Sequence, residues 1–507
     1  MLDKIKTLAE LGGIAATARA KGQKVVLAHG VFDILHVGHK RHLDIGKRHG
    51  DLLIVTLTTD KFVNKGPDRP VFAEKLRAEM IAALECVDYV GISPNPGAEH
   101  IIEIVKPAFY LKGSEYADEE NDVTGRIKTE RMTVEKFGGE VLYTEDITFS
   151  SSNLSNRVLQ LYPEEAAVYL KDLRSRITFD DLKKEVKAVE NKRCLVIGDT
   201  IIDEYVYVEP LGKPAKENII ATKYKSREIF CGGAVATAGL IAQMCESVDL
   251  VTLLGSEDSR EDFIRSGLQQ NINLVPFYRQ GGQTTVKSRL VDPAYVKKLI
   301  EIAYLSDEAL PPQDQGLLNS WVEDNIANYD AVIVNDFGHG MIDADLVDIV
   351  CRKARFLAVN AQTNSANRGF NLITKYPRAD FICIDEPEAR LAAVERYAPI
   401  ETVVREKLEK QIDCHTFVIT HGKLGSIVYT PQDGVKRIPA LTGEAIDTIG
   451  AGDAFFAIAA PLLASGSDPF LAAFIGNAVG AMKVRIVGQR HQITKPEILK
   501  YLSTLLK

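Results

Sequence analysis

The sequence of 507 residues predicts two α/β domains. A chain of this length exceeds what one hydrophobic core usually holds, so two or three domains are expected. Apolar strand-like runs alternate with helical segments in both halves, an order that favours parallel sheets. Between the halves, residues 161–192 are charged and helix-forming without a strand signal. We therefore expect a first domain over 1–160, a helical connector over 161–192 and a second domain over 193–507.

The first half opens with a buried-strand run that leads to a glycine. Lys24 to Ala28 is followed by Gly30, by helical sequence from Lys40 to His49 and by a second apolar run from Leu52 to Leu57. This strand–helix–strand order predicts a right-handed βαβ unit. Further short strands are expected over 87–90, 109–111 and 141–143.

The second half has the same alternation. Thr178 followed three residues later by Asp181 predicts a helix start with a capping box. Cys194 to Ile197 then begins a new strand that ends at Gly198. Helical segments separate most of the later strands, which are expected over 248–254, 331–334, 356–359, 381–384 and 416–420.

Composition indicates an ordinary globular protein. Hydrophobic residues make up 46% and charged residues 26%, and the net charge of -8 gives no support for binding to nucleic acid or to a membrane surface. The seven cysteines are scattered and form no Cys-x-x-Cys pair, which favours reduced thiols and a cytoplasmic location. The longest apolar run, 454–464, is too short to cross a bilayer, so no membrane insertion is expected.

The first candidate site is the segment His36-Val37-Gly38-His39, which follows the first strand and begins a helix. Gly30 lets the backbone approach a phosphate, and a helix N-terminus favours an anion. His36 and His39 are three residues apart, so they lie on one helical face and can donate hydrogen bonds to a polyphosphate. The alternative is a pair of histidines satisfied by local backbone contacts.

Gly30-Val31-Phe32-Asp33 followed by His36-Val37-Gly38-His39 resembles the signature of the cytidylyltransferase-like nucleotidyltransferases. Downstream segments are similar to the other conserved regions of that family: Lys65 with 69–71, the helix 74–79, residues 111–113 and residues 149–152. The resemblance covers about residues 20–160. It implies a Rossmann-like nucleotidyltransferase fold.

The resemblance also implies the reaction, an in-line attack by a substrate phosphate on the α-phosphorus of CTP or ATP with release of pyrophosphate. His36 and His39 would stabilise the charge passing to the pyrophosphate, and Lys65 would neutralise the phosphates. Mg²⁺ would bridge them. Contacts with the nucleotide or its phosphates are implied for Gly30, Phe32, Asp33, Lys112, Ser151 and Ser152. The two serines also suit a plain helix cap.

The second candidate site is Asp447-Thr448-Ile449-Gly450-Ala451-Gly452-Asp453. Three small residues before an apolar helix predict a turn in which the amides of Gly450, Ala451 and Gly452 form an anion-binding nest. Asp453 beside them is placed to take the proton of a substrate hydroxyl that attacks a γ-phosphate. The alternative is an ordinary helix-opening turn capped by an aspartate.

This string resembles the signature of the ribokinase-like sugar kinases, and the resemblance spans about 193–495. Segments 198–203, 232–238, 335–340 and 420–425 are similar to other motifs of that family. A ribokinase-like α/β fold and ATP as a substrate are implied. Asp199, Asp203, Gly232 and Gly233 would contact the sugar, and Gly422 would lie on the adenine side.

The chain departs from the ribokinase-like pattern at two places. The family's Asn-x-x-Glu reads Asp385-Glu386-Pro387-Glu388 here, which keeps Glu388 for Mg²⁺, contacted through water. Where sugar-phosphate relatives carry Asp-Pro-Lys, this chain reads Asn360-Ala361-Gln362-Thr363-Asn364. The departures suit an altered substrate or a kinase that has lost activity. The intact nest and Asp453 favour a working kinase.

Together the two halves predict a bifunctional enzyme of nucleotide-activated sugar synthesis. The combination resembles the bifunctional heptose kinase/heptose-1-phosphate adenylyltransferase family with the domain order reversed. A heptose-like substrate for a surface glycan is expected. Its partners would be a nucleoside triphosphate, a sugar or polyol phosphate and further copies of the chain. The alternatives are a CTP-dependent transferase for a polyol or other small phosphate, a kinase-like half that only binds a ligand or organises an oligomer, and a protein without enzymatic activity.

Overall fold

The computed structural model describes residues 2–63, 69–116, 126–144, 162–213 and 218–507. The chain divides into two compact units, one comprising 1–162 with 496–507 and the other 163–495. The stretch expected as a connector contains α7 (Glu164–Arg174) and α8 (Phe179–Ala188), and both helices fall within the second unit. Helix α17 (Lys495–Leu505) lies almost wholly in the segment grouped with the first unit.

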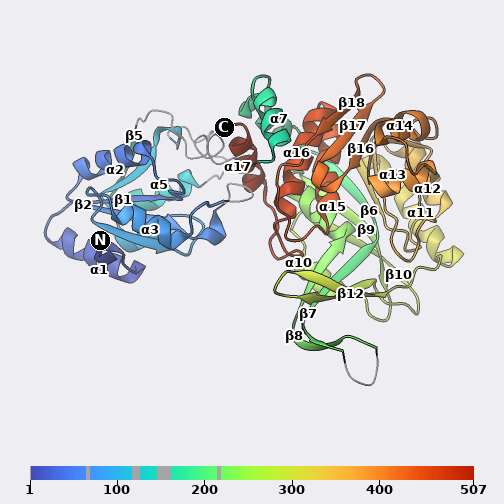
Figure 1. Ribbon diagram of the computed structural model, residues 1–507, viewed down its shortest axis with the longest axis horizontal. Helices are drawn as coiled ribbons and strands as arrows, with labels where there is room; N and C mark the ends of the chain where they lie inside the picture. The colour runs from blue at the N-terminus through green and yellow to red at the C-terminus, as the bar shows by residue number, and fades with distance from the viewer. Residues whose placement is uncertain (1, 64–68, 117–125, 145–161, 214–217) are drawn as a thin grey trace. The chain divides into compact units, whose positions relative to one another are not determined.

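The first unit is built on a five-stranded parallel sheet in the order β3-β2-β1-β4-β5 (Figure 1). Its strands are β1 (Val25–Gly30), β2 (Leu52–Thr58), β3 (Tyr89–Ser93), β4 (Phe109–Gly113) and β5 (Glu140–Thr144). The strand order reverses between β1 and β4. In open α/β sheets this is the point where the carboxyl ends of the strands leave a crevice for a ligand.

Helices cover both faces of this sheet. They are α1 (Leu8–Ala20), α2 (Val37–His49), α3 (Glu74–Ala82), α4 (Glu99–Val105) and α5 (Ile127–Lys136). Because side chains alternate along a strand, Val26 and Ala28 of β1 pack with α2 and α3, whereas Val25 and Leu27 pack with α1 and α4. The predicted Rossmann-like α/β fold is confirmed.

The second unit has a nine-stranded sheet in the order β10-β9-β6-β13-β14-β15-β16-β17-β18. Seven strands are parallel: β6 (Arg193–Gly198), β9 (Ser247–Gly255), β10 (Ile272–Arg279), β13 (Ala331–Asp336), β14 (Leu357–Ala361), β15 (Arg378–Asp385) and β16 (Asp413–Thr420). β17 (Ser426–Thr430) and β18 (Gly434–Ile438) continue the sheet antiparallel. All five later strands expected from the sequence lie in this sheet.

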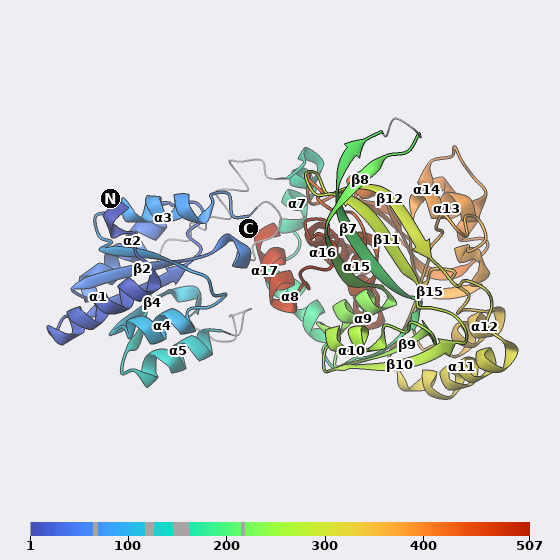
Figure 2. The same cartoon turned by 90° about the horizontal axis from the view of Figure 1, so that it is seen from below.

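Helices again lie on both faces. One face packs on α11 (Pro312–Asn325), α12 (Ala344–Lys353), α13 (Glu386–Ala393) and α14 (Ile400–Val403). The other carries α9 (Ala234–Ala242), α15 (Ala451–Ala464) and α16 (Pro469–Lys483) (Figure 2). The short α10 (Glu261–Gly267) precedes β10. The capping box predicted for Thr178 and Asp181 is confirmed at the start of α8.

A separate four-stranded sheet, which the sequence did not lead us to expect, follows β6. Its order is β12-β11-β7-β8, with β7 (Thr200–Gly212), β8 (Ala221–Gly233), β11 (Val286–Asp292) and β12 (Lys297–Tyr304) (Figure 2). β7 pairs parallel with β11 and antiparallel with β8. In the described part of the chain, no helix combines the length and apolar character needed to cross a membrane.

Candidate active site

In the first unit, the turn from β1 into α2 places the two predicted histidines side by side. His36 is the N-cap of α2, and its Nδ1 accepts a hydrogen bond from the Gly38 amide at 3.1 Å. The His36 and His39 rings are stacked with their centroids 3.9 Å apart. Both imidazoles therefore lie at a helix N-terminus beside the point where the sheet order reverses. Anions bind well at such a terminus, because free amides and the helix dipole meet there.

Phe32 shapes this turn. Its backbone has a φ of +48°, and its ring meets His39 edge to face with the centroids 5.3 Å apart. A Cβ at Gly30 would come within 3.1 Å of the Phe32 ring. The small residue at position 30 thus makes room for Phe32, which in turn limits the positions open to the His39 ring.

Asp33, predicted as a phosphate-site residue, has its carboxylate turned into the protein. The side chain is fully buried and accepts hydrogen bonds from the Val71 amide at 2.7 Å and the Phe72 amide at 3.2 Å. It also pairs with Arg69 at 3.3 Å. Asp33 therefore fastens the segment 69–72 to the β1–α2 turn, and its negative charge is balanced within the fold.

Lys112 stands at the end of β4, next to β1 in the sheet. Its ammonium lies 2.7 Å from the buried carboxylate of Glu130, which also accepts from the Tyr110 hydroxyl at 3.1 Å. Burial, followed by the nearby charge of Lys112, lowers the pKa of His29 to about 3. His29 is therefore neutral at physiological pH, and Lys112 is the neighbouring cation, paired with Glu130.

Arg77 is a buried cation in the helix 74–79, a segment that the sequence singled out by resemblance without giving this residue a role. Its side chain on α3 is fully buried and donates to the carbonyls of Val31, Phe72 and Thr58 and to the Asp60 carboxylate. One guanidinium thus joins the β1–α2 turn to the end of β2 and to the segment before α3. The resemblance of the segment 74–79 to a conserved family region was the signal that could have identified it. Lys65, Ser151 and Ser152 lie outside the described residues, so their roles stay predictions.

In the second unit, α15 begins at the predicted nest. Gly450 is its N-cap in the left-handed region with a φ of +77°, a conformation that favours glycine. A Cβ at Gly452 would meet nothing within 4 Å, so this side of the turn faces open space. Beneath the turn lies the buried Lys483, whose Cε is 3.4 Å from the position of a Cβ at Gly450. Ala451 and Gly452 form the first turn of α15 next to this cation, an arrangement of backbone amides and an ammonium that suits an anion.

Asp453 lies in the same first turn of α15. Its Oδ1 accepts a hydrogen bond from the Gln362 amide at 2.7 Å. Burial raises the pKa of Asp453 to about 6, an effect that the Gln362 hydrogen bond opposes. Asp203 also raises this pKa, whereas Lys287 and Lys483 lower it. A carboxylate with such a pKa is ionised near neutral pH yet basic enough to accept a proton.

The predicted sugar-binding residues fall into two groups. Asp203 lies close enough to Asp453 to act on its charge, pairs with Arg289, and would be 2.3 Å from a Cβ at Gly232. Gly233 has a φ of +57° and caps α9, and a Cβ there would lie 2.5 Å from the Asp199 carbonyl. These glycines thus allow β8 to cross close to β7, which holds Asp203 near the nest.

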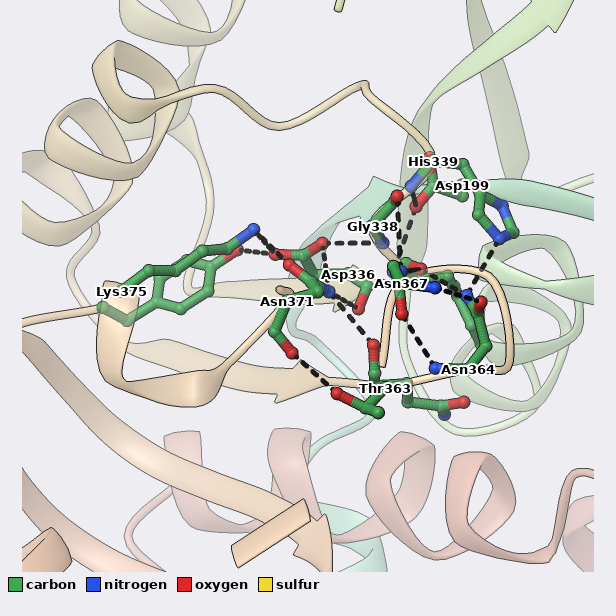
Figure 3. A network of polar contacts seen from close by, with 12 residues as sticks. Asp199, Asp336, Gly338, His339, Thr363, Asn364, Asn367, Asn371 and Lys375 are labelled. Atoms are coloured by element: carbon green, nitrogen blue, oxygen red, sulfur yellow. Dashed lines mark hydrogen bonds and ion pairs between the residues drawn. The ribbon is translucent and has the colours of Figure 1, made fainter. Parts of the chain in front are cut away.

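Asp199 belongs to a different cluster. Its buried carboxylate accepts from the amides of Phe337 at 3.0 Å and His339 at 3.5 Å, so it supports the turn after β13 (Figure 3). Burial, followed by the nearby Asp336 carboxylate, raises the pKa of Asp199 to about 7. The structure therefore separates Asp199 from Asp203, and the first acts on a loop rather than facing open space.

Asp447 ties the nest to distant segments. Its buried carboxylate accepts from Lys298 of β12 at 2.6 Å, from the Tyr205 hydroxyl of β7 at 2.7 Å and from the Gly488 amide at 2.9 Å. Burial alone would raise the pKa of Asp447, but these hydrogen bonds hold it below its usual value. The turn 447–452 is therefore fixed to the four-stranded sheet and to the loop after α16.

Glu388 and Gly422, two further predicted residues, lie just beyond the carboxyl ends of β15 and β16. Asp385 and Glu388 form a capping box at the start of α13, and Glu388 also accepts from the Thr363 amide at 3.0 Å. Burial and the neighbouring Asp385 raise the pKa of Glu388 to about 8. Crowded carboxylates of this kind fit a hard cation such as Mg²⁺, which relieves their repulsion. Gly422 follows β16 with a φ of +52°, and a Cβ there would meet nothing within 4 Å.

Within the ranges that the structure describes, no group of three or more His, Cys, Asp or Glu side chains could hold a metal ion. The second unit combines a helix start suited to an anion, a carboxylate with a raised pKa and open space beside Gly452. This arrangement on a nine-stranded α/β fold defines a kinase-type phosphotransferase. Residues 191–496, more than half of the chain, match the model of the pfkB family of carbohydrate kinases, and the chain belongs to that family.

The first unit carries the second family match. Residues 27–157 match the model described as cytidylyltransferase-like. Both resemblances predicted from the sequence are thereby confirmed.

Curated relatives match the N-terminal region. Bifunctional protein HldE of Geobacter metallireducens is 40% identical over 168 residues, which are 32% of this chain and 32% of that protein. HldE of Geobacter sulfurreducens is 37% identical over 168 residues with the same coverage. The chain thus spans about a third of the length of these relatives.

Phosphofructokinase-2 from Escherichia coli in complex with potassium aligns with a TM-score of 0.51 and 12% identity. The alignment covers 62% of this chain and 100% of that one, and it shows the fold of the second unit.

Proposed function

We propose that the chain is a bifunctional enzyme of nucleotide-activated sugar synthesis, with a heptose-like substrate for a surface glycan. The second unit would phosphorylate a sugar or sugar phosphate with ATP. The first would transfer a nucleotidyl group from ATP or CTP to a sugar phosphate and release pyrophosphate. One observation carries the proposal: each unit holds its own helix N-terminus with a reactive or charge-stabilising side chain beside it. The similarity of the first unit to proteins named as bifunctional supports it.

In the kinase reaction, the substrate hydroxyl attacks the γ-phosphorus of ATP, the bond from that phosphorus to the bridging oxygen breaks to release ADP, and Asp453 accepts the hydroxyl proton. The amides of Gly450, Ala451 and Gly452, with Lys483 beneath them, stabilise the negative charge on the phosphates. Asp203 orients the substrate by accepting hydrogen bonds from its other hydroxyls. Mg²⁺ would be held mainly by the nucleotide phosphates, with Glu388 contacting it through water, and it would neutralise charge during transfer.

In the transferase reaction, an oxygen of the substrate phosphate attacks the α-phosphorus of the nucleotide, and the bond to pyrophosphate breaks. His36 and His39 donate hydrogen bonds to the pyrophosphate as its charge increases. Lys112 contributes positive charge at the neighbouring strand end. In this proposal, Lys65, Ser151 and Ser152 also contact the phosphates of the nucleotide or the substrate.

The direct test is release of ADP and of pyrophosphate from the purified chain. ATP and CTP are each supplied with heptose, hexose and polyol substrates and with their phosphates. We expect ADP with one sugar class and pyrophosphate with one nucleotide. Pyrophosphate release without ADP release from any sugar would leave a transferase fused to a ligand-binding kinase fold. Absence of both products would contradict the proposal.

The pH dependence of the kinase follows from Asp453. Because the folded-state pKa of this carboxyl is raised to about 6, the carboxylate is ionised at pH 7 and becomes protonated as the pH falls through 6. A protonated carboxyl cannot accept the hydroxyl proton, so kcat/KM for ADP formation should fall by about tenfold per pH unit below that value. Steady-state rates between pH 5 and 8 measure this limb. A profile that stays flat to pH 5 would contradict the role of Asp453 as the base.

We also propose that the chain forms homo-oligomers through the four-stranded sheet. Alternate residues of β12, Ile300, Ile302 and Tyr304, are 49%, 45% and 45% exposed, and Tyr224 of β8 is 62% exposed. Exposed apolar side chains gathered on one sheet are typical of an interface. Sedimentation should show an oligomer that Ile302→Glu weakens by about tenfold or more. Val394→Glu, at an exposed residue beyond α13, is the control, and a monomeric wild-type chain would refute the proposal.

A further inference from the structure

The segment that follows β14 is one of the two places where the chain departs from the ribokinase-like pattern. Gln362 is its first residue beyond the strand, and its Nε2 donates to Asp453 Oδ1 at 2.7 Å. This contact joins residues that are 91 positions apart in the sequence. The proposed base is thus held by a neutral primary amide.

The backbone of Gln362 is fixed on both sides. Its amide donates to the Asp336 carbonyl at 2.8 Å, and its carbonyl accepts from Asn371 Nδ2 at 3.1 Å. Asn371 also donates to the Asp336 carboxylate at 3.1 Å, and Lys375 pairs with that carboxylate at 2.5 Å. The backbone of Gln362, from which its side chain extends, is therefore anchored to the end of β13 and to the segment that precedes β15.

Two more asparagines hold the rest of the loop, as Figure 3 shows. Asn364 and Asn367 both donate from their side chains to the Phe337 carbonyl, at 3.0 and 2.8 Å. The Asn367 side chain also accepts from the Asn364 amide at 2.9 Å. Such a network of satisfied amides makes the loop rigid, because a shift of one residue breaks several hydrogen bonds. These hydrogen bonds hold the loop, and with it Gln362, in one position.

We infer that Gln362 is a positioning residue for the kinase reaction, which fixes one oxygen of Asp453 so that the other faces the substrate hydroxyl. The inference rests on the proposed kinase function. A donor to the ionised form keeps a buried carboxylate charged. A cation in the same place would lower its basicity much further, whereas a neutral amide leaves it able to accept a proton. An amide therefore suits a base that must be both ionised and reactive.

Other charged groups act on Asp453 from the elements around it. Asp203 of β7 raises its pKa, and Lys287 of β11 and Lys483 of α16 lower it. Glu388 of α13 also lies close enough for the two charges to interact. These charges of opposite sign remain when Gln362 is replaced, so the contribution of the amide can be measured separately.

The test compares Gln362→Leu, which removes the donor, and Gln362→Glu, which places a second carboxyl against Asp453. Gln411→Leu is the control, since Gln411 is an exposed glutamine whose side-chain amide donates to the Lys407 carbonyl at 3.2 Å. Two readouts are taken from the full-length chain. One is the titration of Asp453 by NMR of ¹³C-labelled aspartate carboxyls, with its signal identified by loss in Asp453→Asn. The other is the pH profile of ADP formation with the most active sugar.

In Gln362→Leu, we expect the pKa of Asp453 measured by NMR to rise by about one unit. The pKa that governs the acidic side of the rate profile should rise by the same amount, and both should rise further in Gln362→Glu. kcat should fall about tenfold in Gln362→Leu with KM for ATP unchanged. The control should match the wild type. An unchanged titration in folded Gln362→Leu and Gln362→Glu would overturn the inference. A shifted titration in a chain that phosphorylates no sugar would instead refute the kinase function, and with it the positioning role.

Discussion

Asp453→Asn should lower ADP formation by about 10²- to 10⁴-fold while pyrophosphate release by the first unit continues at the wild-type rate. The amide has nearly the shape of the carboxylate, so the nest over Gly450 to Gly452 and its affinity for nucleotide should persist. What the substitution removes is the group that accepts the hydroxyl proton. The expected signature is a fall in kcat with little change in KM for ATP, measured by coupled ADP assay.

The matched control for this variant is Asp348→Asn. Asp348 lies on the outer side of α12, where it pairs with Arg352 and is 60% exposed. This substitution removes the same charge from the same unit and should leave both activities unchanged. Retention of full ADP formation in Asp453→Asn would exclude Asp453 as the base.

His39→Ala should reduce pyrophosphate release by about 10²- to 10³-fold and leave ADP formation intact. The imidazole stacks on His36 at a helix N-terminus, where a donor opposes the charge that builds on the departing pyrophosphate. Because the lost contact strengthens in the transition state, the effect should appear in kcat rather than in nucleotide affinity. Pyrophosphate release, measured with the nucleotide that the wild type prefers, reports the change.

His49→Ala is the comparison for this second variant. His49 is the last residue of the same helix, is exposed, and its Nδ1 contacts the Ile45 carbonyl at 2.8 Å. It should behave as the wild type. If either His39→Ala or Asp453→Asn disabled both activities in a folded chain, the two independent sites would have to be replaced by a single shared one.

All five strands of the first sheet and six of the nine strands of the second could be predicted, because parallel strands are buried on both faces, whereas β10, β17 and β18 were not expected. Val25 to Ala28 and Leu195 to Ile197 are almost wholly inaccessible, and their sequences are unbroken apolar runs. The turns that bear the histidines and the nest could be predicted for a related reason. Their chemistry depends on residues that are adjacent in the chain.

The four-stranded sheet lacked such a signal. β8 exposes five consecutive residues, 223–227, three of which are charged, and most of β12 is exposed as well. A strand with so little buried surface shows neither an apolar run nor a regular alternation. β8 is stabilised by backbone hydrogen bonds to β7, and β12 by backbone hydrogen bonds to β11, and such bonds leave no signal in the composition.

Site residues that act across the fold were also beyond prediction. Asp33 and Asp199 were expected to face ligands, and the structure turns both toward backbone amides of distant loops. Gln362, Lys483 and Arg77 reach their partners only through tertiary packing. A motif identifies which side chains can do chemistry, whereas the contacts that orient them depend on three-dimensional proximity.

The hydrogen bonds of Asp447 bear on when the kinase site is completed during synthesis. Asp447 takes its partners from Tyr205, Lys298 and Gly488, and the first of these lies 242 residues earlier in the chain. During translation from the N-terminus, the anion-binding turn lacks its last anchor until Gly488 has emerged from the ribosome. In the first unit, the hydrogen bond from the Gly38 amide to His36 joins residues only two positions apart, so its partners emerge together. The turn at Asp447 therefore depends on contacts between distant parts of the chain, and it forms later in synthesis than the local hydrogen bond at His36.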